Sequence, residues 1–75
     1  MHKIKYKGYD IEAKPYKSDD SGEWKIGLLI SRELASREFY PKGLLKTEEE
    51  AVKFCLDLGV RIIDGEVKDC SVEDL

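Results

Sequence analysis

The sequence lacks the long apolar run that a membrane protein needs and the leader that an exported protein needs. Its longest uncharged apolar stretch covers residues 26–30, far short of the roughly 18 apolar residues that indicate a membrane-spanning helix. The first residues carry charge but have no apolar segment behind them, so they do not resemble a signal peptide. We therefore expect a cytoplasmic protein with no membrane association.

Side chains that carry out chemistry are scarce. The single histidine, His2, lies beside a terminus that we expect to fray, whereas a general base must be held in place. Cys55 and Cys70 have neither CxxC spacing nor a nearby histidine, and a reducing cytosol disfavours a disulfide between them. The glycines are scattered singly, so there is no phosphate-binding loop. We expect no catalytic residue, no metal site, no cofactor and no enzyme activity.

Charge is abundant but unevenly distributed. The chain of 75 residues is one domain by length, with 39% charged residues and a net charge of −3. Residues 1–17 hold five lysines against two carboxylates, whereas residues 64–75 hold five carboxylates against one lysine. We divide the chain into a domain over residues 1–65 and an acidic tail over residues 66–75, which Val67, Val72 and Leu75 could dock.

Alternating apolar and polar residues predict a β-hairpin at the N-terminus. The turn falls at Lys7-Gly8, and Pro15 should end the second strand or lie on an edge, because proline has no amide hydrogen. The inward positions are Ile4, Tyr6, Tyr9, Ile11 and Ala13. A polar turn cluster over residues 18–22 should then lead to a third strand.

The third strand is predicted over residues 23–32 as the most apolar strand of the sheet. Its inward positions include Ile26, Leu28 and Ile30, and Gly27 leaves a gap on the opposite face. Leu29 lies on that opposite face and should be exposed unless something covers it. Residues 33–37 read as a loop, followed by a short fourth strand over residues 38–40.

A helix over residues 48–64 is the strongest local prediction. Thr47 and Glu50 have the spacing of a capping box, and three glutamates suit the positive end of the helix dipole. The apolar stripe recurs at three- and four-residue steps through Ala51, Phe54, Cys55, Leu58 and Ile62. Gly59 inside the helix suggests close approach to the sheet, and Gly65 suits the C-terminal cap.

The order of these elements predicts the fold class. Strands followed by one helix indicate an α+β domain: an antiparallel sheet of three to four strands with one C-terminal helix packed on one face, in the order β-β-β-(β)-α. The other face of the sheet would then carry lysines and carboxylates and remain in contact with water. The early strands and the helix would form one core and leave no residues for a reaction centre.

Several short segments resemble a known group of bacterial proteins. These are residues 6–11, Pro15, residues 22–27, Phe39, residues 47–51 and residues 62–65. Together they are similar to the short HlyU-type proteins, which are labelled transcriptional activators, over roughly residues 4–65. The resemblance implies a compact β-rich domain with a C-terminal helix, a bacterial source and no catalytic residues. The acidic tail departs from the HlyU-type pattern.

The absence of reactive groups favours a non-catalytic interaction module whose partner is another protein or a second copy of the chain. The candidate partner-binding residues are Lys3, Lys5, Lys7, Lys14 and Leu29. The alternative is a nucleic-acid-associated regulator, because lysines alternate with tyrosines in the N-terminal hairpin. However, lysines also protect edge strands from aggregation, and an overall pI near 5.1 opposes a dedicated nucleic-acid binder.

Overall fold

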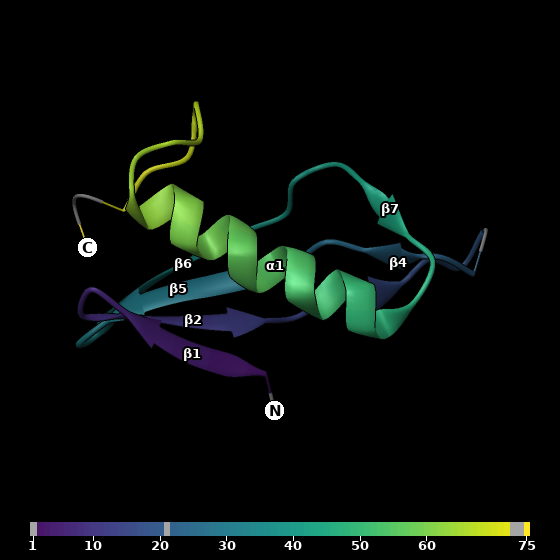
Figure 1. The fold of residues 1–75 in the computed structure, drawn as a ribbon, viewed down its shortest axis with the longest axis horizontal. Helices are drawn as coiled ribbons and strands as arrows, with labels where there is room; N and C mark the ends of the chain where they lie inside the picture. Colours follow the sequence, from purple (N-terminus) through teal and green to yellow (C-terminus); the bar gives the residue numbers. More distant parts are fainter. Residues whose placement is uncertain (1, 21, 73–74) are drawn as a thin grey trace.

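The computed structural model describes residues 2–20, 22–72 and 75, so Ser21 of the predicted turn cluster and Glu73 and Asp74 of the tail lie outside the described residues. The described residues form two antiparallel sheets and one helix, which confirms the predicted α+β class (Figure 1). The elements are β1 (Lys3–Tyr6), β2 (Tyr9–Ala13), β3 (Tyr16–Lys17), β4 (Trp24–Lys25), β5 (Leu28–Arg32), β6 (Ala35–Phe39), β7 (Leu44–Leu45) and α1 (Glu48–Ile63).

The N-terminal hairpin forms as predicted. Tyr6 pairs with Tyr9, which leaves only Lys7 and Gly8 in the loop. Both loop residues have positive φ, 48° at Lys7 and 85° at Gly8. Two positive φ angles in a two-residue loop match the twist of the flanking strands, and glycine adopts this conformation without steric cost.

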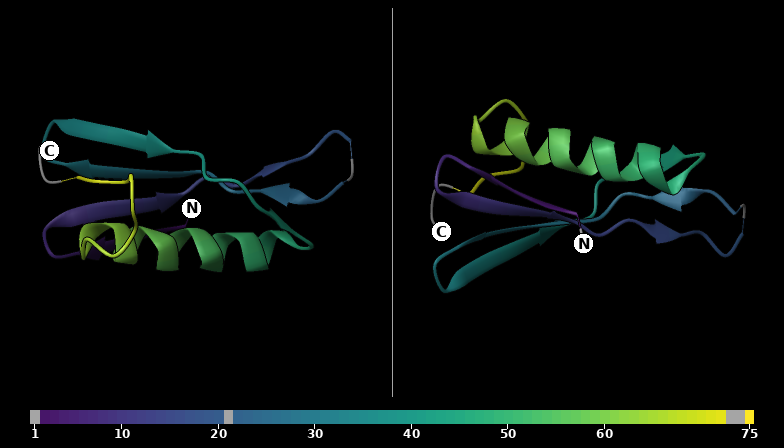
Figure 2. Two further views of the ribbon diagram at one scale, coloured as in Figure 1. Left: turned by 90° about the horizontal axis from the view of Figure 1, so that it is seen from above. Right: turned by 60° about the horizontal axis from the view of Figure 1, so that its bottom comes forward.

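The predicted single strand over residues 23–32 is wrong, because it is interrupted at Ile26 and Gly27 and forms β4 and β5. The register nevertheless continues across the interruption. Ala13 pairs with Leu28 in one sheet, and three residues further along each strand Tyr16 pairs with Lys25 in the other. In this register Pro15 lies opposite Ile26. The amide of the preceding Lys14 donates to the Gly27 carbonyl at 2.8 Å, so the nitrogen of Pro15 points away from this pairing, which tolerates a proline. One long hairpin therefore contributes to both sheets, which follow one another along the molecule (Figure 2).

The predicted loop over residues 33–37 is also wrong. β6 begins at Ala35, pairs with β5 through Arg32, and leaves a two-residue loop of Glu33 and Leu34. The strand is mostly polar and lies at the edge of the sheet, whose order is β1-β2-β5-β6. An edge strand buries few of its side chains, so β6 needs no alternation of apolar and polar residues. Without that alternation the sequence does not show where the strand begins.

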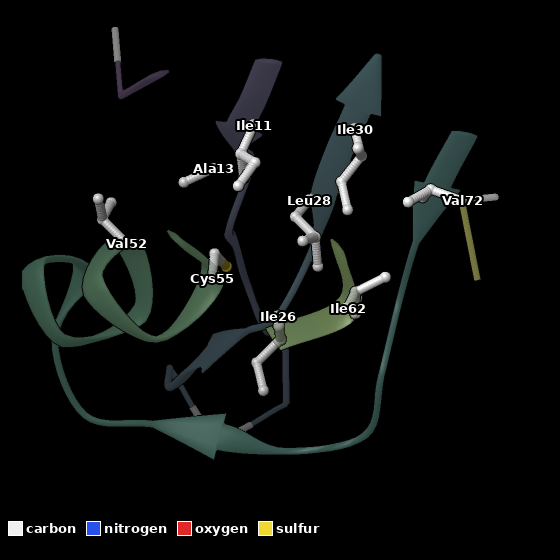
Figure 3. Close-up of a cluster of buried hydrophobic side chains, with 9 residues drawn as sticks. All are labelled: Ile11, Ala13, Ile26, Leu28, Ile30, Val52, Cys55, Ile62 and Val72. Atoms are coloured by element: carbon white, nitrogen blue, oxygen red, sulfur yellow. The ribbon is translucent and has the colours of Figure 1, made fainter. Parts of the chain in front are cut away.

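Helix α1 packs on one side of the two sheets, and the helix and the sheets together form the core (Figure 3). The nine residues of the buried cluster are Ile11, Ala13, Ile26, Leu28, Ile30, Val52, Cys55, Ile62 and Val72. The predicted close approach at Gly59 is confirmed, because a Cβ at this position would lie 2.5 Å from Cγ2 of Ile11. The strands and the helix therefore share one interior, as the sequence indicated.

Both helix ends carry the predicted caps. The Thr47 hydroxyl accepts a hydrogen bond from the Glu50 amide at 3.2 Å, and it donates to the Glu50 carboxylate at 3.1 Å. At the other end Gly65 has a φ of 77°, and its amide donates to the Ile62 carbonyl. The Glu66 amide donates to the Arg61 carbonyl, which completes a Schellman motif.

One position of the predicted helix stripe is corrected, and the tail proves to be part of the core. Phe54 is 43% exposed, so it borders the interior and does not fill it. Val72 is only 2% exposed, and its carbonyl accepts a hydrogen bond from the Tyr9 hydroxyl at 3.2 Å. Arg37 donates to the Ser71 carbonyl at 2.7 Å. One helix is too narrow to cover four strands, so the tail covers part of the sheet that the helix leaves open.

Candidate functional site

The outer face of the sheets, opposite α1, carries two exposed tyrosines. Tyr16 is 44% exposed and Tyr40 is 60% exposed. Their ring centroids lie 6.3 Å apart at an interplanar angle of 73°, which is an edge-to-face pair. The Lys25 ammonium lies 5.9 Å from the centroid of the Tyr16 ring.

We call this region the Tyr16–Tyr40 surface. A shallow cavity of about 330 Å³ opens on it, within the size range of small-ligand and side-chain pockets. The cavity is lined by Tyr16, Lys25, Tyr40, Pro41, Lys42, Gly43 and Leu44. These residues come from β3, β4, β7 and the segment that joins β6 to β7.

Gly27 explains why Tyr40 takes this place. A Cβ at residue 27 would lie 2.7 Å from the Lys14 carbonyl oxygen and 3.4 Å from the Tyr40 ring. The gap that the sequence indicated beside Gly27 is therefore filled by the Tyr40 ring. The same ring shields Gly27 on the face where Leu29 also lies, and Leu29 is half-buried there.

Charge around the Tyr16–Tyr40 surface is mainly basic. Residues 40–46 contain Lys42 and Lys46 and no carboxylate, and Lys25 lies beside them. Glu38 is the acidic neighbour: it accepts a hydrogen bond from the Tyr40 hydroxyl at 2.7 Å and lies 3.9 Å from the Lys14 ammonium. The hydrogen bond to Glu38 raises the pKa of the Tyr40 hydroxyl, which therefore stays protonated and oriented.

The lysines predicted for the N-terminal hairpin are distributed differently. Lys3 pairs in register with Glu12, and Lys5 pairs with Asp10, so each lysine faces a carboxylate across the strands. The Lys7 side chain does not lie beside Lys3 and Lys5. Its ammonium lies 2.7 Å from the Asp64 carboxylate at the helix C-terminus. Lys3 and Lys5 remain exposed beside these carboxylates, whereas Lys7 is paired with Asp64.

Lys14 and Leu29 lie closer to the Tyr16–Tyr40 surface. Lys14 pairs with Glu38, the residue that orients Tyr40. Leu29 lies between Glu12 and Glu38 on adjacent strands and is half-buried. The structure therefore brings two of the five predicted residues near the tyrosine pair and leaves Lys3, Lys5 and Lys7 apart from it.

The tyrosines of the first hairpin serve the interior, as predicted. The Tyr6 hydroxyl donates to the Asp64 carboxylate at 3.0 Å, and the Tyr9 hydroxyl donates to the Val72 carbonyl. Only Tyr16 of the lysine-flanked tyrosines is exposed, and its partner Tyr40 was not singled out from the sequence. The signal that could have found Tyr40 is Gly27, since a bare position on a central strand leaves room for a ring from the next strand.

Cys55 is fully buried, and burial raises the pKa of its thiol, so it is a packing residue and a poor nucleophile. Within the described ranges, no group of three or more histidine, cysteine or acidic side chains is placed to hold a metal ion. The part of the chain that the structure describes also contains no helix with both the length and the apolar character for crossing a membrane.

Comparison with known proteins adds no assignment. No family model matches the chain, and neither the curated proteins nor the solved structures give a match. The resemblance to HlyU-type proteins therefore stays a prediction, and the case for function depends on the surfaces of the molecule.

Proposed function

We propose that the protein is a non-catalytic binding module that docks an acidic segment of a protein partner on the Tyr16–Tyr40 surface. The observation that carries this proposal is the exposed edge-to-face tyrosine pair beside Lys25 and Lys42. The two rings are not part of the buried cluster that α1 covers, and the Tyr40 ring stays 60% exposed although it contacts Gly27.

The chemistry of this surface suits recognition of acidic, partly apolar chains. Tyrosine supplies a large contact area at low entropic cost and is enriched at the energetic centres of interfaces. Leu44, which is 50% exposed, adds an apolar contact at the side of the cavity. The surrounding lysines would attract carboxylates and speed the encounter at low ionic strength.

The test is a titration of the isotopically labelled chain, followed by NMR. The probe is a ten-residue peptide of glutamates with two phenylalanines, and a peptide with lysines in place of the glutamates is its control. The glutamate peptide should shift the amide signals of Tyr16, Lys25 and Tyr40, and the lysine peptide should not. A Tyr16→Ala/Tyr40→Ala variant should bind at least about tenfold more weakly. Leu34→Ala, at a fully exposed site elsewhere, should bind normally.

A single-stranded nucleic acid is the second candidate, and the exposed tyrosine pair is again what favours it. Bases stack on aromatic side chains that lie beside cations. The carboxylates of Asp10, Glu12 and Glu38 on the same face argue against it, as does the net charge of −3. A ten-nucleotide oligothymidine in the same titration separates the two candidates. If the oligonucleotide binds more tightly than the glutamate peptide and salt weakens its binding, a nucleic acid is the partner and the proposed protein partner is wrong.

Self-association remains a prediction that the described surfaces support weakly. Leu29 is half-buried between Glu12 and Glu38, so it offers less apolar area for a second copy than the sequence suggested. Sedimentation at two protein concentrations tests the prediction. A mass that stays that of the monomer at both concentrations would remove it.

A further inference from the structure

A second groove lies on the helix side of the molecule, away from the Tyr16–Tyr40 surface. It has a volume of about 570 Å³ and runs between the first strand and the flank of α1. Its apolar lining comes from Ile4, Val52 and Leu56, and Ile4 is 38% exposed. Glu48, Glu49 and Asp57 line it from the helix.

Strand β1 forms one wall of this groove and is an edge strand. The sheet order β1-β2-β5-β6 leaves β1 with one neighbour. In a hairpin closed by two residues, the pair next to the loop exchanges hydrogen bonds, and alternate pairs after it do the same. Tyr6 and Ile4 therefore bond to β2, and the backbone N–H and C=O groups of Lys3 and Lys5 point away from the sheet.

We infer that β1 accepts an additional β-strand from a partner protein, one in which acidic residues alternate with apolar residues. The side chains of a strand alternate between the two faces of a sheet. The acidic residues of the added strand would lie on the outer face beside Lys3 and Lys5, and the apolar residues would enter the groove beside Ile4. This inference is independent of the Tyr16–Tyr40 surface and concerns the β1 edge of the sheet.

Charge decides the arrangement of the added strand. Lys3 and Lys5 are exposed, and opposite charges on directly paired strands stabilise the pairing. The groove side carries three carboxylates, those of Glu48, Glu49 and Asp57, against the one lysine Lys53, and this excess would repel acidic residues placed there. A strand with acidic residues on one face and apolar residues on the other satisfies both conditions.

A second copy of the chain fits this edge poorly. If two β1 strands paired antiparallel, Lys3 of one copy would face Lys5 of the other on the outer face. Like charges directly opposite each other destabilise strand pairing, and lysines on edges are a common device against such contacts. The same lysines that oppose self-pairing would favour an acidic partner strand.

The experiment titrates the full-length labelled chain with an eight-residue peptide of alternating valine and glutamate. We expect shifts in the amide signals of Lys3 and Lys5 and in those of Val52 and Leu56. A peptide of the same composition with its four valines adjacent should bind at least about tenfold more weakly, because it cannot place all acids on one face. A peptide methylated at every backbone nitrogen should not bind, since it cannot form the ladder.

Variants of the chain complete the test. Lys3→Glu/Lys5→Glu should weaken binding of the valine-glutamate peptide by about tenfold and allow a valine-lysine peptide to bind. Lys68→Glu, a single charge reversal of the same kind in the exposed part of the tail, should leave binding unchanged. Lys5→Pro should abolish binding while Lys5→Gln retains most of it, because only proline removes the outward N–H.

Several results would overturn the inference. Equal binding of the methylated peptide would show that no strand is added, and this readout does not depend on how the Lys5→Pro variant folds. Equal binding of the adjacent-valine peptide, or shifts confined to Tyr16 and Tyr40, would show that β1 is not the site. Tighter binding of the valine-lysine peptide to the unmodified chain would assign the groove to a basic partner and contradict the proposed chemistry.

Discussion

Gly59 shows how one residue sets the distance between the helix and the sheet. Its missing side chain lets Ile11 pack directly against the helix backbone, and Ile11 is fully buried there. Glycine inside a helix costs about 1 kcal/mol relative to alanine, so the packing at this contact must compensate for the loss.

Gly59→Ala should therefore destabilise the protein by about 1–3 kcal/mol, although alanine is the better helix former. The added Cβ would lie 2.5 Å from Ile11 Cγ2 and would force the helix away from the sheet. Urea unfolding of the single variants and of Gly59→Ala/Ile11→Ala measures this effect. With Ile11 shortened, the alanine should be neutral or stabilising. A single Gly59→Ala variant that is more stable than the parent would contradict the account.

Asp64 links the first turn to the end of the helix. It accepts hydrogen bonds from Tyr6 and Lys7, and the bond from Lys7 lowers the pKa of the Asp64 carboxyl. Asp64 in turn raises the pKa of Lys7. The free energy from Asp64 is complete above the ordinary aspartate pKa of about 4 and is lost as the pH falls through the lowered value. The contribution of Lys7 is lost as the pH rises through its raised value.

Asp64→Asn should accordingly flatten the decline in the free energy of unfolding below pH 4, and it should lower stability at pH 7. Asp57→Asn, the same change at an exposed helix position, is the matched control. Denaturant unfolding between pH 2.5 and pH 7, about the range in which carboxylates titrate, gives the comparison. Identical pH profiles for the two variants would show that the contacts of Asp64 with Tyr6 and Lys7 contribute nothing to stability.

Residue-level features were predictable where one physical cause dominates. The turn at Lys7-Gly8, the cap at Thr47 and the close approach at Gly59 each follow from local chemistry, and the structure confirms them. Phe54 was placed inside by periodicity alone, which does not show how far the interior extends along the helix. Tyr40 was missed because its position depends on the gap beside Gly27 on a neighbouring strand.

At the scale of elements, the tail is a structural part of the domain. Val72 is 2% exposed and belongs to the buried cluster, next to a sheet region that α1 does not cover. The sequence showed only that Val72 could dock. The tail docks only if the sheet leaves a space that Val72 can fill. The amino-acid composition of the tail does not reveal where such a space lies.

Val72→Ala should destabilise the protein by about 1–3 kcal/mol through lost burial and an unfilled space. Leu34→Ala removes a larger side chain at a fully exposed loop position and should change stability by less than about 0.5 kcal/mol. Thermal and urea unfolding of the two variants checks this contrast. Equal effects would mean that the tail does not pack against the core in solution.

The strand boundaries were harder to predict than the helix. The break at Pro15 and Ile26 lies within a continuous register, so apolar alternation runs through it unchanged. Strand β6 is an edge strand that buries little, and its mixed polar sequence resembles a loop. Pairing with a neighbouring strand decides both cases, and the sequence of one strand alone does not show how it pairs.

At the scale of the whole molecule, the two faces of the sheet carry different side chains. The helix face holds the core, and the outer face holds the Tyr16–Tyr40 surface. No reactive cluster was expected from the sequence, and that expectation stays a prediction. Under the proposed function, the exposed tyrosines serve binding and contribute little to stability.

Parallel measurement of unfolding and binding for a Tyr16→Ser/Tyr40→Ser variant tests this claim most directly. The account predicts that the variant unfolds at nearly the urea concentration of the parent, well above that of Val72→Ala, because both rings are exposed. It also predicts that the glutamate-phenylalanine peptide binds the variant at least about tenfold more weakly. A variant that unfolds as early as Val72→Ala and binds the peptide like the parent would contradict the account.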